Sequence, residues 1–135
     1  AITLGYATKT TENATQDQDD TNMGVKIVSG DISLIISQGQ YEASDEDIES
    51  QGAAISYKLP NGMTIGAFSF KSEDDLDVGE EYTASGGEVQ YTIASGLTAV
   101  ITVVDYDYKV TAANHENSPT ADSGTMSQLT IKTSF

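Results

Sequence analysis

The residues of this sequence best suited to chemistry are carboxylates gathered in two short runs. One run is Asp45-Glu46-Asp47, and the other is Glu73-Asp74-Asp75 followed after one residue by Asp77. Carboxylate oxygens are hard ligands that suit Ca²⁺. Neither run has the Gly and Glu spacing of an EF-hand loop, and ordinary solvation of charged loops is the alternative. No cofactor is required by the sequence, and the candidate calcium ligands are Asp45, Glu46, Asp47, Asp74, Asp75 and Asp77.

Catalytic chemistry has little support in the sequence. His115 is the only histidine, and its neighbours Glu116 and Ser118 would be parts of a serine hydrolase, but no hydrolase motif surrounds them. The chain also lacks cysteine, which excludes thiolate metal sites and disulfides. With 21 acidic residues and six lysines, the net charge of −15 would repel nucleic acid. We therefore expect neither an enzyme nor a nucleic-acid-binding protein.

The elements that must position these residues are strands, because apolar and polar or small residues alternate along the chain. Ile2, Leu4 and Tyr6 begin this pattern, and convincing runs at helical spacing are absent. The alternation predicts eight strands over about residues 2–11, 23–29, 32–40, 52–59, 63–71, 82–93, 97–109 and 125–135.

The connections between these strands alternate in length. Short turns at Gly30-Asp31, Pro60-Asn61-Gly62 and Ser95-Gly96 alternate with four long polar segments, residues 12–20, 41–51, 72–81 and 110–124. A transmembrane β-barrel has short periplasmic turns on one side and long external loops on the other. A soluble sandwich also alternates apolar and polar residues, but it has no reason to sort its loops by length. We therefore expect one all-β, antiparallel transmembrane barrel segment over residues 1–135.

In such a barrel, the apolar side of each strand meets lipid and the other side lines the lumen. The predicted lipid-facing residues are Leu4, Val25, Ile27, Ile32, Leu34, Ile55, Leu59, Ile65, Val89, Ile93, Leu97, Ile101, Leu129 and Ile131. The predicted pore-lining residues of most interest are Lys9, Lys26, Lys58, Lys132, Thr102 and Gln128. Seventeen of the 21 acidic residues fall in the long segments, which predicts a negatively charged external mouth.

The aromatic residues sort into two groups by position along the strands. Tyr57, Tyr91 and Phe135 lie near the short turns, and the others lie nearer the long loops, as two girdles at the lipid interfaces would. The strands over residues 63–71 and 97–109 are apolar on both sides, which a β-bulge, a neighbouring subunit or an inner loop would explain.

Three segments resemble the general porins of Gram-negative bacteria, in particular the alphaproteobacterial type. They are Tyr57-Lys-Leu-Pro-Asn-Gly-Met-Thr-Ile-Gly-Ala-Phe68, Tyr91-Thr-Ile-Ala-Ser-Gly-Leu-Thr-Ala-Val100 and Leu129-Thr-Ile-Lys-Thr-Ser-Phe135. In outer-membrane barrels, a terminal aromatic residue preceded by alternating apolar residues is the recognition signal for insertion. Leu129, Ile131 and Phe135 match this assembly signal, whereas Thr133 stands where an apolar or aromatic residue is usual.

The resemblance implies a channel for passive diffusion of small polar solutes and ions in the bacterial outer membrane. Such porins have about 16 strands and are commonly homotrimers in contact with lipid and lipopolysaccharide. The chain therefore resembles the C-terminal half of a porin, and the rest of the porin chain would close the barrel. A complete eight-stranded barrel acting as an anchor or adhesin, and a soluble calcium-binding β-domain, are the alternatives.

Overall fold

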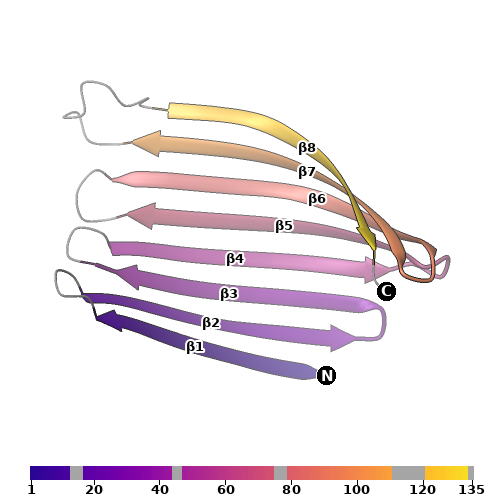
Figure 1. Cartoon of the computed structure of the whole chain (residues 1–135), viewed down its shortest axis with the longest axis horizontal. Helices are drawn as coiled ribbons and strands as arrows, with labels where there is room; N and C mark the ends of the chain where they lie inside the picture. Colours follow the sequence, from indigo (N-terminus) through magenta and orange to yellow (C-terminus); the bar gives the residue numbers. More distant parts are fainter. Residues whose placement is uncertain (13–16, 44–46, 75–78, 111–120, 134–135) are drawn as a thin grey trace.

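The protein forms a single open β-sheet (Figure 1). The computed structural model describes residues 1–12, 17–43, 47–74, 79–110 and 121–133, with side chains described for residues 1–6 and from residue 18 onward. Eight strands follow one another in sheet order, and every neighbouring pair is antiparallel. They are β1 (Ile2–Glu12), β2 (Asp17–Ser29), β3 (Ile32–Glu42), β4 (Asp47–Lys58), β5 (Met63–Asp74), β6 (Glu80–Ala94), β7 (Leu97–Val110) and β8 (Ala121–Thr133).

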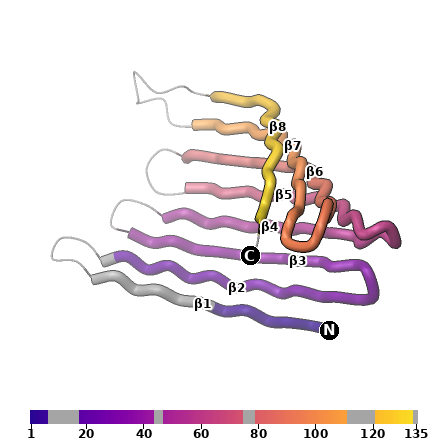
Figure 2. The backbone as a smooth tube through the Cα atoms, turned by 45° about the vertical axis from the view of Figure 1, so that its right-hand side comes forward, coloured from indigo at the N-terminus to yellow at the C-terminus, as the bar shows by residue number. Residues whose placement is uncertain are grey.

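The predicted all-β, antiparallel fold is confirmed, but the sheet is not closed. β1 and β8 are the two edges, and they pair only with β2 and β7 in the described part of the chain. Figure 2 shows the sheet twisting, with the short-turn ends of β6, β7 and β8 swinging across the remaining strands. Twist is the normal consequence of right-handed strand geometry.

The predicted short turns form as expected. Gly62 has a φ of 83° and Gly96 a φ of 75°, a left-handed backbone that residues with a Cβ rarely adopt. Before Gly62, the side chain of Asn61 accepts a hydrogen bond from the Met63 amide at 3.1 Å, and the Gly62 amide donates to the Leu59 carbonyl at 3.0 Å. Both are local bonds that favour turns.

The strands extend farther into the acidic segments than the sequence predicts. Residues 17–20, 47–51, 72–74, 80–81 and 121–124 belong to strands rather than loops. The register is continuous there, for example between Asp19 and Glu42 and between Glu73 and Glu81. A backbone ladder needs no buried side chain to continue, so a pattern of hydrophobic residues underestimates strand length.

The register defines two faces, because directly opposed residues in a sheet point to the same side. Face A contains the odd-numbered residues of β2, β4, β5, β6, β7 and β8 and the even-numbered residues of β1 and β3, and face B contains the alternate residues. One row of face A runs through Leu4, Val25, Ile36, Ala53, Ser69, Ser85, Asp105 and Thr125.

Exposed large hydrophobic side chains gather on face A. Of 21 such side chains, 16 lie on face A, four lie on face B, and Ile93 lies at the register shift between Thr92 and Ala94. The only buried hydrophobic residues among those described are Ala84 and Val100, which are 8% and 3% exposed. The accessible surface is 9473 Å², whereas a compact monomer of this mass would have about 6,800 Å². The sheet therefore leaves most of its apolar area uncovered.

The polarity of the two faces reverses along the strands. On β5, β6 and β7, face A is aliphatic and face B is mostly polar toward the short turns, whereas face A is polar and face B carries aromatic residues toward the long loops. Of the three explanations for the apolar residues on both sides of β5 and β7, a β-bulge within these strands is not found. Pairing is regular from Met63 to Asp74 and from Leu97 to Val110, and the register shift lies in β6, between Thr92 and Ala94. The apolar residues on both sides of these strands belong to two different apolar surfaces.

The aromatic residues near the long loops, which the sequence predicts to form a girdle, do not all share one face of the sheet. Tyr6 lies on face A with the aliphatic residues. The other aromatic residues of this group lie on face B: Tyr41, Phe68, Phe70, Tyr82, Tyr106 and Tyr108. Alternation within each strand sets this placement, and depth along the strand does not reveal it.

Several of these rings on face B pack over glycines of adjacent strands. Phe68 is directly opposite Gly86, and Tyr106 is directly opposite Gly124. A Cβ added to Gly86 would overlap the Val103 carbonyl oxygen and lie 2.9 Å from the Phe68 ring. The absence of a side chain at Gly86 thus gives the ring its space, and cross-strand contacts of this kind stabilise a sheet.

Replacement of Gly86 by alanine should destabilise the sheet by about 1–3 kcal/mol, because the added methyl must displace backbone as well as Phe68. Gly87→Ala is the matched control, since a Cβ there meets only the Gly66 carbonyl oxygen at 3.4 Å. Unfolding by urea measures the stability of both variants. Equal unfolding midpoints for the two variants would contradict the packing described at Gly86.

Candidate functional site

A polar surface occupies face B between the short turns and the aromatic residues. One of its rows runs through Ser33, Ser56, Gly66, Glu88, Thr102 and Gln128, which are directly opposed from strand to strand. The next row toward the short turns contains Lys58, Thr64, Gln90, Val100 and Thr130. Hydroxyl, amide and charged groups thus share one side of six strands.

The predicted pore-lining residues all occupy face B. Thr102 and Gln128 are direct neighbours. Lys26, Lys58 and Lys132 are on β2, β4 and β8, so the fold does not bring their ammonium groups together. Lys9 is placed on face B by its pairing with Asp20, near the long loops, and its side chain lies outside the described residues.

One residue of this polar surface was missed by sequence reasoning. Glu88 lies between Gly66 and Thr102 in the register and is half-buried. The Thr102 hydroxyl donates a hydrogen bond to Glu88 Oε2 at 3.4 Å. The sequence could have identified it, because Glu88 alternates with Gln90 and Thr92 along β6, and residues two apart in a strand lie on the same side.

The aliphatic surface of face A forms a belt with an oblique border. In the row that begins with Tyr6 on β1 and Met23 on β2, the residues from Gln38 on β3 to the last strand are polar. In the row that begins with Leu4 on β1, the residues from Ser69 on β5 to β8 are polar. Along β8 itself, from the short-turn end toward the long loop, Leu129 is the last large apolar residue on face A. Met23 on β2 is in register with Ser123 on β8, whereas the border on β8 lies at Leu129. The border therefore shifts by six residues along the strands over six strand spacings, which is an angle of about 35° from the direction of the rows of paired residues.

The ends of the strands are staggered in the same sense. The row that starts at the first short turn with Ser29 and Ile32 reaches Val89 and Ile101, yet β6 and β7 continue beyond it to Ala94 and Leu97. At the opposite end, β1 and β2 continue farthest, to Glu12 and Asp17. A progressive stagger of this kind is the shear that a tilted barrel wall requires.

Charged residues lie on face A on the long-loop side of the aliphatic belt. The Lys71 ammonium contacts the Glu73 and Glu81 carboxylates, the second at 3.1 Å. Lys109 lies 3.5 Å from Glu81 and 3.3 Å from Asp107. The hydrogen bonds that Lys71 donates to Glu73 and Glu81 raise the pKa of Lys71, and the bond that Glu81 accepts from Lys71 lowers the pKa of Glu81.

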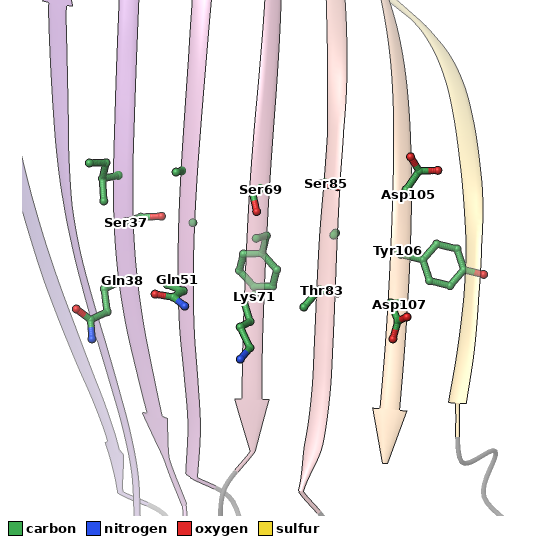
Figure 3. A pocket seen from close by; sticks show the side chains of 15 residues that line it. Ser37, Gln38, Gln51, Ser69, Lys71, Thr83, Ser85, Asp105, Tyr106 and Asp107 are labelled. Carbon is green, nitrogen blue, oxygen red and sulfur yellow. The ribbon is translucent and has the colours of Figure 1, made fainter. Parts of the chain in front are cut away.

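An open groove of about 650 Å³ crosses face A beside these charges (Figure 3). Lys71 lies in it, with Gln51 from β4 on one side and Thr83 from β6 on the other. Asp105 and Asp107 come from β7. The groove offers amide, hydroxyl and charged groups directly above the belt.

The other predicted site residues fall partly outside the described chain. Asp45, Glu46, Asp75, Asp77, His115 and Phe135 are not described. Asp47 and Asp74 lie at the long-loop ends of β4 and β5, where the Asp47 amide donates to Asp74 Oδ1 at 3.4 Å. The described residues contain no group of three or more potential metal ligands. Leu129 and Ile131 of the assembly signal are on face A, 67% and 53% exposed.

Comparisons with known proteins give no relative from which to transfer a function. No family model, no curated protein and no solved structure matches the chain. Among the described residues, no helix is long and apolar enough to cross a membrane.

Replacing Lys71 with glutamine should raise the pKa of Glu81 toward the ordinary glutamate value, because the lysine is the main cause of its lowering. A lowered carboxyl pKa gives stability that is present above the unfolded-state pKa and is lost as the pH falls through the folded-state pKa. NMR of ¹³C-labelled carboxyl groups measures the change. Lys26→Gln, on face B, is the control and should leave the Glu81 pKa unaltered.

Proposed function

We propose that this chain is part of the wall of a bacterial outer-membrane porin, with face A toward lipid and face B toward a water-filled channel. The channel would allow passive diffusion of small polar solutes and ions. The observation that carries the proposal is the oblique aliphatic belt on face A combined with the polar surface behind it on face B. Strands of a membrane barrel are tilted by about 35–45° and so require an apolar belt that crosses them obliquely.

Lipid would cover what the sheet leaves exposed. Sixteen large apolar side chains on one face would promote aggregation in water. In a bilayer they would meet hydrocarbon, while the backbone groups of the inner strands remain paired within the sheet. The strands have 11–15 residues, which is enough to cross the hydrocarbon with tilt and to extend beyond it.

We further propose that additional strands complete the barrel to about 16. A complete eight-stranded barrel would pair β1 with β8, whereas both edges are open in the described sheet. Open edges with unpaired backbone groups cannot face hydrocarbon. The rest of a porin chain would satisfy these edges, and the assembled barrel would be a homotrimer.

The charged residues above the belt suit the outer leaflet. Lipopolysaccharide head groups would meet the groove of Gln51, Lys71 and Thr83, and the acidic long segments would give the external mouth a negative potential. Calcium at these segments remains part of the proposal. Leu129, Ile131 and Phe135 would serve as the assembly signal, and no enzymatic step is involved.

The membrane orientation predicts opposite labelling at two adjacent residues of β5. Ile65 is on face A and Thr64 on face B, and the chain has no native cysteine to interfere. In outer membranes, Thr64→Cys should react with a water-soluble thiol reagent and Ile65→Cys should react only with a lipid-soluble one. Reaction of both with the water-soluble reagent would argue for a soluble β-domain.

The channel function predicts stable conductance in planar bilayers for the protein that carries this segment. Cations should permeate better than anions because acidic residues dominate the long segments. The control is the same preparation after heat denaturation, which should conduct no current. A correctly folded protein without conductance would exclude the diffusion function and favour an anchor or adhesin.

A further inference from the structure

We infer that Glu88 and Thr102 form a cation-binding site inside the channel, and that Glu88 contributes to cation preference independently of the acidic mouth. The inference rests on the proposed function, since it requires face B to line water. Its ligands would be monovalent metal cations and small organic ammonium ions. The site would add a fixed negative charge to the channel wall, and this charge would favour cations over anions during diffusion.

Glu88 is isolated from the other carboxylates. Among the described strand residues of face B, the remaining acids lie toward the long loops: Asp20, Asp74, Glu80 and Asp122. Glu88 lies instead on the short-turn side of the aromatic residues, in the row of Gly66, Thr102 and Gln128. A cation that has passed the mouth would meet a negative charge again at this depth.

The surroundings of Glu88 are open on one side and covered on another, so that the residue is half-buried. Gly66 on β5 has no side chain to cover it, whereas the Phe68 ring occupies the space over Gly86 on the same face of β6. Thr102 on β7 donates one hydrogen bond, to Oε2, whereas an ionised carboxylate can accept about four. The amide oxygen of Gln128, beyond Thr102 in the same row, and that of Gln90 are further acceptors on this surface.

The charge of Glu88 is also uncompensated by an ion pair within the described chain. The ion pairs that join two residues of the described chain involve Lys71 or Lys109 and lie on face A. Glu81, on the same strand as Glu88 but on face A, is held between these two lysines. Two glutamates of β6 thus have opposite situations, one neutralised on the outside and one available on the inside. A fixed charge in a narrow aqueous path with low-dielectric walls attracts counter-ions strongly.

The test is the reversal potential of the purified full-length protein in planar bilayers under a KCl gradient. Glu88→Gln should lower the cation-to-anion permeability ratio by about twofold, as loss of one unit charge acting over about 10 Å through water with about 0.1 M salt implies. Glu88→Asp should retain most of the wild-type ratio. Glu81→Gln is the matched control, and it should change the ratio less than Glu88→Gln does, because Lys71 and Lys109 already neutralise the Glu81 charge.

A second variant guards against misfolding of Glu88→Gln. Thr102→Lys leaves Glu88 in place but sets an ammonium beside it, and it should lower the same ratio. Heat-modifiable migration on gels verifies folding of each variant. A conducting wild type whose ratio is unchanged in both Glu88→Gln and Thr102→Lys would overturn this inference and leave the porin function intact. Absence of conductance in the folded wild type would overturn both.

Discussion

The cross-strand register is the constraint on which the rest of this structure depends. Side chains alternate between the two faces with a period of two, so a shift of one residue in any pairing would exchange the faces of a whole strand. The continuous register from β1 to β8 places Leu4, Val25, Ile36 and Ala53 in one row. The aliphatic belt, the polar surface and the charged network all follow from this alignment.

Polarity reverses along β5, β6 and β7, which supports the proposal that the sheet passes through more than one environment. On β7, Ile101 and Val103 are on face A and are followed there by Asp105, whereas Val104 on face B is followed by Tyr106. A sheet packed on one side against a core would keep its apolar residues on that side throughout. A barrel wall that crosses a membrane and continues beyond it would have apolar residues on its outer face within the hydrocarbon, and this requirement ends where the wall leaves the membrane.

Electrostatics follows the same division of faces. The lysines near the long loops, Lys71 and Lys109, are held by carboxylates on face A, whereas Lys26, Lys58 and Lys132 share face B with Glu88. Exposed pairs contribute little to stability because water and salt screen them. Their importance lies in which charges they neutralise, since an unpaired charge acts on mobile ions and a paired one acts much less.

The sequence by itself determined the eight strands, their order and the three short turns, because alternation and turn residues such as Asn61-Gly62 are local signals. It also determined which alternate residues share a side within each strand, and the polarity of those sides grouped Thr102 and Gln128 on the same predicted face. Only the tertiary structure decided how far the strands extend into the acidic segments, that Phe68 and Phe70 lie opposite the aliphatic belt, and that Glu88 adjoins Thr102. These features depend on pairing between strands, which places residues distant in sequence side by side and which no local pattern encodes.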